Sequence, residues 1–368
     1  MKMSSFENTA AAEMKTSRLL SGVLSGVLSA AALSLSVLCA TPASAADPIK
    51  LRVADLYANT HVIGKNSIQW FMEEVTRRTG GRVQFEYFPQ ETLAKSADMV
   101  DALRSGRAQM ANVLYIGNLN PLLYVVQLPG TYSDEKLGEA SRALFQFVQT
   151  NPVVQETMNK LSIKPVFCLT VTNYQVITNR DNLATLDGLK GMKIMANGVV
   201  LPLSAKALGA VPVSFNPNEA YEGLNRGVLD GVALGVPSVA AYKFYETTKS
   251  SLLNLDMGGF PVCYAISNTA WASLPPDVQK IMSDLAGPTM INVSQALASS
   301  QDADLKKWAE RGIKLNRLNA ADKKRSVEML RTVEATWVQA LEAKGMKGAK
   351  AAIADWKSIL NKQMNPTR

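Results

Sequence analysis

The sequence lacks the residue patterns on which most catalytic and metal-binding sites depend. Its 368 residues contain a single histidine, His61, and no cysteine pair has the spacing of a zinc site. A Ser, His, Asp triad would have only this one base, and no nucleophile elbow accompanies it. Walker, GxGxxG and EF-hand motifs are also missing. We therefore expect a binding protein rather than an enzyme, without a cofactor or a metal.

The composition is that of a soluble globular protein, with 47% hydrophobic and 19% charged residues. The length is sufficient for two lobes that each have a core. The formal net charge of +8 could indicate nucleic acid as a partner. However, basic residues concentrate near the C-terminus, as in 323–325 and 344–350, where a solvated helix face explains them. No nucleic-acid partner is expected.

The first 45 residues read as a secretory signal peptide. Lys15 and Arg18 precede an apolar run, residues 19–40, and the small residues that follow end at Ala45. The run is rich in Ser, Gly and Ala rather than Leu and Ile, which disfavours a membrane anchor. Cleavage near Ala45 would deliver the mature chain to the periplasm.

Two points stay open from the sequence. The chain could start at Met1 or at Met14, because the sequence after Met14 is an ordinary start of a signal peptide. Cys168 and Cys263 fall in predicted strands, and they could form a disulfide in an oxidising compartment or remain buried thiols.

Strand and helix patterns alternate along both halves of the mature chain. Apolar alternation and helical periodicity give a β, α, β, α, β order up to residue 115, which predicts a mostly parallel sheet covered by helices. The same alternation returns after Tyr174, with predicted strands at 192–197, 211–214 and 228–234. The fold class is therefore α/β.

The stretch from Phe215 to Glu246 has the clearest local signals. Asn216 and Pro217 are typical of the start of a helix, and Gly227 is typical of its end. An apolar run, 228–234, follows directly and predicts a buried strand. Ligands of open α/β sheets sit at the carboxyl ends of strands, so we expect part of a binding site at the end of this one.

This stretch also carries a family resemblance. The segments LNRGVLDG at 224–231 and KFYE at 243–246 resemble the signature of TRAP transporter solute receptors. Further similarity lies in GGRV at 80–83, LDGLKGMKI at 186–194 and WASLPPDVQ at 271–279. The resemblance covers nearly all of the mature chain.

The resemblance implies a two-lobed, type II-like periplasmic binding protein that closes on a small molecule and delivers it to the small and large permease subunits of a TRAP transporter. Each lobe would be a mostly parallel sheet flanked by helices, with long C-terminal helices. The lobes expected are 46–172 plus 259–297, and 173–258 plus 298–368. Two crossover strands would form the hinge, and Pro288 would kink or break a long helix that begins near Pro276. The family leaves open a monomer or a helix-swapped dimer.

Three polar anchor positions of the family are replaced in this chain. The family holds its ligand carboxylate with an arginine two positions after a strand lysine, and here Met195 follows Lys193 at that distance. A second family arginine, four residues before a Thr-Asn pair, falls on Tyr174. The family segment DGQENP reads DGVALG at 230–235. We therefore expect an apolar or aromatic ligand with few polar groups.

The expected ligand-binding residues come from strand ends and from the loop after the first strand. They are Asp55, His61, Leu114, Tyr115, Tyr174, Met195, Asn197, Phe215, Leu234 and Phe260. His61 matches a family histidine and could line the pocket or cap a helix. Asp55 at the pocket mouth would favour a cationic or hydroxylated ligand.

Three alternatives remain at this point. Arg180 or Arg226 could supply the clamp, which would make the chain a conventional receptor for an organic acid or dicarboxylate. The receptor could instead hand its ligand-loaded state to a signalling partner. A periplasmic enzyme on the same fold would need His61 for turnover.

Overall fold

The computed structural model describes residues 47–113 and 120–366, which belong to one compact unit. The expected signal peptide, residues 1–45, lies outside the described residues, as do Leu114 and Tyr115. Among the helices of the described part, none is long and apolar enough to cross a membrane.

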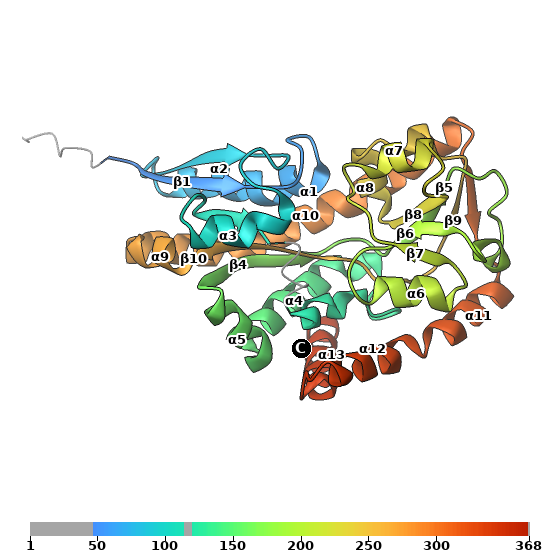
Figure 1. Cartoon of the computed structure of the whole chain (residues 1–368). Helices are drawn as coiled ribbons and strands as arrows, with labels where there is room; N and C mark the ends of the chain where they lie inside the picture. Colours follow the sequence, from blue (N-terminus) through green and yellow to red (C-terminus); the bar gives the residue numbers. More distant parts are fainter. Residues whose placement is uncertain (1–46, 114–119, 367–368) are drawn as a thin grey trace, which may run out of the picture. The chain divides into compact units, whose positions relative to one another are not determined.

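The described strands form two mixed sheets (Figure 1). The first sheet has the order β2 (Val83–Phe88), β1 (Ile49–Ala54), β3 (Met110–Asn112), β10 (Pro261–Ser267) and β4 (Ile163–Thr170). The second has the order β11 (Lys314–Arg317), β9 (Ser250–Leu253), β5 (Gln175–Thr178), β8 (Gly231–Leu234), β6 (Lys193–Met195) and β7 (Val211–Val213). In each sheet one strand, β10 or β5, runs antiparallel to its neighbours. The predicted α/β fold with mostly parallel sheets is confirmed.

Helices cover both sheets and present their apolar residues to them. Beside the first sheet lie α1 (Val62–Gly64), a π-helical turn η1 (Lys65–Gln69), α2 (Trp70–Arg78), α3 (Met99–Arg104), a 3-10 helix η4 (Pro121–Gln127), α4 (Leu137–Thr150), α5 (Pro152–Lys160) and α9 (Asn268–Ser273). With the second sheet belong α6 (Leu201–Ala207), α7 (Ala220–Asn225) and α8 (Val236–Ala241).

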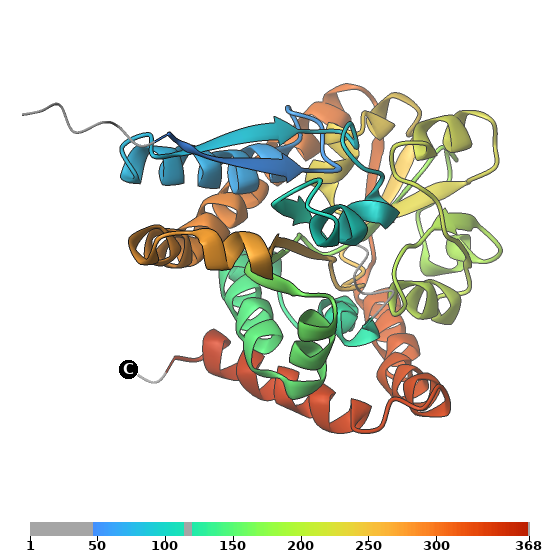
Figure 2. The same cartoon turned by 60° about the vertical axis from the view of Figure 1, so that its left-hand side comes forward.

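Two short segments and one long helix connect the two sheets in the described part of the chain. The chain leaves the first sheet after β4 and enters the second at β5, and it returns between β9 and β10. Figure 2 shows β4 and β10 side by side, and their antiparallel register places Cys168 opposite Cys263. The two sulfur atoms form a disulfide. The structure thus decides a question that the sequence left open.

The long helix α10 (Pro276–Glu310) passes both sheets, contacting α2 and α4 on the side of the first and α8 and β11 on the side of the second. Of the two outcomes expected at Pro288, a kink or a break, the break does not occur, because the 35 residues form one continuous helix. Pro288 removes one backbone donor, but Leu285 and Thr289 are buried around it and anchor the helix on both sides of the proline.

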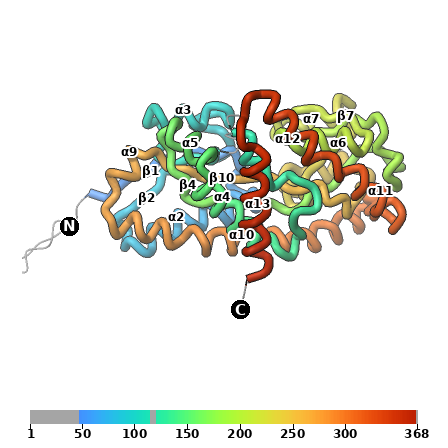
Figure 3. The backbone as a smooth tube through the Cα atoms, turned by 90° about the horizontal axis from the view of Figure 1, so that it is seen from below, coloured from blue at the N-terminus to red at the C-terminus, as the bar shows by residue number. Residues whose placement is uncertain are grey.

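Three helices, α11 (Ala320–Leu330), α12 (Val333–Ala343) and α13 (Ala349–Met364), end the chain (Figure 3). The first two contact α6, beside the second sheet. The sequence placed α13 with the second lobe, but it packs against α4, where the Trp356 ring meets Phe147 edge to face at 6.0 Å. The C-terminal helices therefore bind the two sheets together.

Candidate functional site

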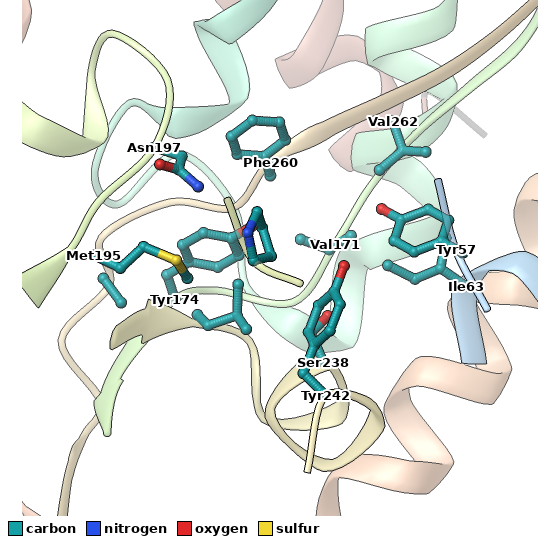
Figure 4. A pocket seen from close by; sticks show the side chains of 13 residues that line it. Tyr57, Ile63, Val171, Tyr174, Met195, Asn197, Ser238, Tyr242, Phe260 and Val262 are labelled. Atoms are coloured by element: carbon teal, nitrogen blue, oxygen red, sulfur yellow. The ribbon is translucent and has the colours of Figure 1, made fainter. Parts of the chain in front are cut away.

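A pocket opens between elements of the two sheets, and residues of the β4–β5 and β9–β10 connections line it (Figure 4). Its empty volume, including space open to solvent, is about 480 Å³. The lining residues are Tyr57, Ile63, Val171, Tyr174, Met195, Asn197, Pro217, Ala233, Leu234, Ser238, Tyr242, Phe260 and Val262. The shape of the pocket therefore depends on how the two sheets are placed relative to each other.

The second sheet supplies an apolar wall. Met195 and Leu234 are the last residues of the neighbouring strands β6 and β8, and both are almost fully buried. Pairing of β6 with β8 is parallel, so the two strand ends reach the same edge of the sheet. The strand register thus fixes Met195 and Leu234 at the position where ligands of α/β sheets bind.

Aromatic side chains from the connecting segments face this wall. The Tyr174 and Phe260 rings are nearly parallel, with an interplanar angle of 14° and centroids 6.4 Å apart. Tyr124 meets the Phe260 ring edge to face at 5.3 Å and supports it from behind. Such rings offer flat apolar surface and little polarity to a ligand.

The polar groups of the pocket are uncharged. They are hydroxyls of Tyr57, Tyr174, Tyr242 and Ser238 and the amide of Asn197. Figure 4 shows the hydroxyls of Tyr57 and Tyr242 directed toward the same part of the pocket. Among the described lining residues there is no lysine, arginine, aspartate or glutamate. The described lining residues can bind polar atoms through neutral hydrogen bonds but offer no counter-charge.

The arginines considered as alternative clamps lie elsewhere. The guanidinium of Arg180 pairs with Asp230 at 2.8 Å, and that of Arg226 pairs with Glu222 at 3.5 Å. Neither arginine lines the pocket. A conventional clamp from either residue would require a different arrangement of its side chain.

His61 lies behind the pocket wall rather than in it. Its ring contacts those of Tyr57 and Tyr242, with centroids 4.3 and 5.1 Å away. The Ile63 amide donates to His61 Nδ1 at 3.2 Å, which places the ring proton on Nε2 and makes His61 the N-cap of α1. Burial lowers the pKa of His61 to about 3, so the ring is neutral. Of the two expected roles, the helix cap is the one the geometry shows.

The expectation that Asp55 lies at the pocket mouth is wrong. Its carboxylate is 0% exposed and accepts hydrogen bonds from Tyr87 Oη at 2.8 Å, Tyr264 Oη at 2.9 Å and Asn112 Nδ2 at 3.0 Å. The Tyr57 amide adds a longer bond at 3.3 Å. Burial raises the pKa of Asp55 to about 6 against the opposing effect of these donors. The network fixes the loop that carries Tyr57 and leaves no carboxylate facing a ligand.

The remaining predicted residues fall into three groups. Tyr174, Met195, Asn197, Leu234 and Phe260 lie together in the pocket. Phe215 lies instead in an outer groove that continues from Asn197 to Lys95 and Glu91, with an empty volume of about 1010 Å³. Leu114 and Tyr115 lie outside the described residues.

Tyr57, Ser238 and Tyr242 line the pocket but were not predicted from the sequence. A signal existed for each, because Tyr57 follows the first strand and the other two follow the strand that ends at Leu234. A helix start was predicted at Asn216 and Pro217, whereas α7 begins at Ala220 after a turn. Pro217 thereby becomes part of the pocket lining.

Comparison with known proteins identifies the family. The profile of the bacterial extracellular solute-binding proteins, family 7, matches residues 53–361. The chain belongs to this family. The resemblance to TRAP transporter solute receptors is thereby confirmed, and its functional class is solute binding for transport.

Curated relatives in this family are distant. The C4-dicarboxylate-binding periplasmic protein DctP of Rhodobacter capsulatus is 25% identical over 90% of this chain and 98% of its own length. The C4-dicarboxylate-binding protein DctB of Bacillus subtilis is also 25% identical, over 61% of this chain and 65% of its own length.

Solved structures share the fold at lower identity. A TRAP solute-binding protein from Rhodoferax ferrireducens, in complex with copurified benzoate, has a TM-score of 0.78 at 21% identity and covers 86% of this chain and 98% of its own. One from Bordetella bronchiseptica with bound (R)- and (S)-mandelate has a TM-score of 0.75 at 22% identity, covering 86% and 100%. Members of this fold therefore include binders of aromatic acids.

Proposed function

We propose that this solute receptor binds a ring-containing, largely apolar molecule, aromatic or aliphatic, with at most one acidic group. The observation that carries the proposal is the wall of Met195, Leu234, Tyr174 and Phe260, which has no cation among the described lining residues. A buried carboxylate without a counter-charge costs several kcal/mol, and a dicarboxylate would meet this cost twice.

The fold neighbours support the same ligand class, because two of them were solved with benzoate and with mandelate. Tyr57, Ser238 and Tyr242 could hold one carboxylate through hydroxyl groups. The curated relatives that bind C4-dicarboxylates favour the alternative, a conventional dicarboxylate receptor. A receptor that feeds a signalling partner would use the same pocket.

In this proposal the mature chain works in the periplasm after cleavage near Ala45, as a monomer or as a helix-swapped dimer. Its lobes, 46–172 plus 259–297 and 173–258 plus 298–368, close on the ligand while α13, in the second of these ranges, stays packed on α4 of the first. The loaded form docks on the small and large permease subunits. The ligand stabilises the closed form because it binds that form more tightly than the open form.

The ligand class can be tested on protein purified directly from periplasm. Native mass spectrometry would show any retained ligand, and a thermal-shift screen would compare benzoate, mandelate, succinate and malate, since a bound ligand raises the melting temperature. We expect shifts with benzoate or mandelate and none with succinate or malate. Shifts confined to the dicarboxylates would overturn the proposal.

A variant pair tests the missing clamp directly. Met195→Arg places a guanidinium in the apolar wall, and we expect it to strengthen succinate binding at least tenfold and to lower the melting temperature. Met195→Leu keeps the wall apolar and serves as the matched control, with benzoate affinity within about threefold of the wild type. Unchanged succinate affinity in Met195→Arg would show that this position does not govern ligand charge.

A further inference from the structure

The side chain of Gln127 joins elements that belong to different sheets. Gln127 ends η4, which packs against α4, β10 and α13 beside the first sheet, and it is 0% exposed. Its amide Nε2 donates to the Asn197 carbonyl at 2.9 Å, on the loop between β6 and α6 of the second sheet. Its Oε1 accepts from the backbone N–H groups of Val200 and Leu201, both at 3.1 Å.

These bonds replace the cap that α6 lacks. Val200 occupies the N-cap position and has no side chain that can accept a hydrogen bond from the first turn. The acceptor comes instead from Gln127, 73 residues away from Val200 in sequence. The backbone N–H groups of Val200 and Leu201 therefore keep this acceptor only while the second sheet stays beside η4.

The backbone around Gln127 is shaped to receive it. Gly198 has a φ of +92°, and a Cβ there would lie within 3.0 Å of the Gln127 amide. Gly258 has a φ of +78°, and a Cβ there would lie 2.6 Å from the Gln127 carbonyl. Gly198 belongs to the loop between β6 and α6, and Gly258 belongs to the connection from β9 back to β10 in the first sheet.

The loop that Gln127 holds is part of the pocket. Asn197 lines both the pocket and the outer groove, and its side chain bonds the Phe215 backbone in two places, at 2.9 and 3.1 Å. A movement of the loop would therefore shift Met195 and Phe215 relative to Tyr57 on the opposite side. We propose that Gln127 is a positioning residue, an interlobe latch that keeps the two pocket walls in the binding arrangement.

The latch is tested first without any ligand. Gln127→Met keeps the length of the side chain and removes all three hydrogen bonds. We expect amide hydrogen exchange at Val200 and Leu201 to become about tenfold faster. We also expect small-angle scattering of the ligand-free protein to show a larger radius of gyration, because the lobes separate more often.

The matched control is Gln279→Met. Gln279 donates to the Trp271 and Leu274 carbonyls, at 2.8 and 3.1 Å, and so bonds only α9 and the residue that follows it. Its loss should lower the melting temperature but leave exchange at Val200 and Leu201 and the scattering at wild-type values. Wild-type exchange and scattering in Gln127→Met, or equal changes in both variants, would overturn the latch.

Gln127→Glu separates the hydrogen bonds that the Gln127 side-chain oxygen accepts from the one that its nitrogen donates. It also replaces Gln127→Met as the test variant if Gln127→Met does not fold. It keeps acceptor oxygens for Val200 and Leu201 but places a carboxylate against the Asn197 carbonyl. We expect protection of Val200 and Leu201 to be kept, while the radius of gyration still increases. Loss of that protection in a folded Gln127→Glu protein would contradict the assignment of its oxygen as the cap of α6.

Affinity gives the functional readout, and this part rests on the proposed function. With benzoate as the probe, we expect Gln127→Met to bind about tenfold more weakly and Gln279→Met to bind as the wild type does, because a less populated binding arrangement lowers apparent affinity. If the wild type binds succinate or malate but neither benzoate nor mandelate, the proposed ligand class fails, while exchange and scattering still decide the latch.

Discussion

The strand ends of the two sheets lie near one pocket but carry opposite chemistry. In the first sheet the residue after β1 is Asp55, a buried carboxylate surrounded by four donors that does not line the pocket. In the second sheet the equivalent ends of β6 and β8 carry Met195 and Leu234. The first sheet keeps a buried charge because donors of the protein itself satisfy it. The strand ends of the second sheet carry no charge, and there only a ligand could have satisfied one.

The ionisable groups near the pocket stabilise the fold and are distinct from the groups that a ligand would contact. Asp55 and His61 are ionisable and close to the pocket, yet their hydrogen bonds hold the loop that carries Tyr57 and the start of α1. In the proposed site a ligand would contact rings, aliphatic side chains and hydroxyls. Variants of the first sheet should therefore change stability, whereas variants of the second wall should change ligand choice.

The largest expected effect comes from the cross-link in the first sheet. Replacing Cys168 and Cys263 with alanine should lower the free energy of unfolding by about 4 kcal/mol, because their sequence separation of 95 residues leaves a large loop unconstrained in the unfolded chain. Urea unfolding with and without reductant measures it. The double variant should not respond to reductant, and an unchanged midpoint relative to the oxidised wild type would refute the effect.

Asp55→Ala should cost about 3 kcal/mol, since it strands the hydroxyls of Tyr87 and Tyr264 and the amide of Asn112 without their acceptor. Chemical denaturation gives the value. Asp101→Ala, on an exposed helix position, is the control and should change stability by less than about 0.5 kcal/mol. A similar small loss for Asp55→Ala would mean that the network is not structural.

Asp55 and His61 should give opposite pH dependences. Burial raises the pKa of Asp55 from 3.8 to about 6, so its contribution to stability is complete below pH 3.8 and is lost as the pH rises through about 6. Burial lowers the pKa of His61 from 6.5 to about 3, so its contribution is complete above pH 6.5 and is lost as the pH falls through about 3. The two effects partly cancel in the wild type.

Single variants should expose each contribution. From pH 7 to pH 4, Asp55→Asn should lose about 2 kcal/mol more stability than the wild type, and His61→Asn, which keeps a helix-capping side chain, should lose about 3 kcal/mol less. Burial also raises the pKa of the facing Tyr87 and Tyr264, so these phenols do not titrate in this range. Parallel pH curves for all three proteins would contradict the assignment.

The smallest expected effect concerns ligand choice. Phe260→Leu removes one of the two parallel rings, and we expect benzoate affinity to fall about fivefold, with little change in unfolding. Phe145→Leu, beside the first sheet and away from the pocket, should leave benzoate affinity unchanged. Calorimetric titration compares them, and equal affinities in both variants would exclude the Phe260 ring from the site.

The sequence predicts those parts of the site that strand register determines. Met195 and Leu234 end apolar strands, and Tyr174 and Phe260 border the crossovers, so their convergence follows from the α/β alternation. The ends of helices and loops are less determined by pattern, which is why Tyr57 and Tyr242 were missed.

Contacts between distant segments cannot be inferred from one sequence. The partners of Asp55 include Tyr264, 209 residues away, and without them an aspartate after a strand looks like a ligand contact. The Cys168–Cys263 pairing depends in the same way on the register of β4 with β10. Gln127 carries no signal in the sequence, because its role as a cap depends on α6, a helix beside the other sheet.

The most direct test of the missing counter-charge is a paired calorimetric titration. Wild-type protein, freed of retained ligand by unfolding and refolding, would be titrated with benzoate and with succinate under the same conditions. The uncharged pocket predicts that benzoate binds at least about 100-fold more tightly. Tighter binding of succinate would show that a cation reaches the pocket and that the ligand is a dicarboxylate.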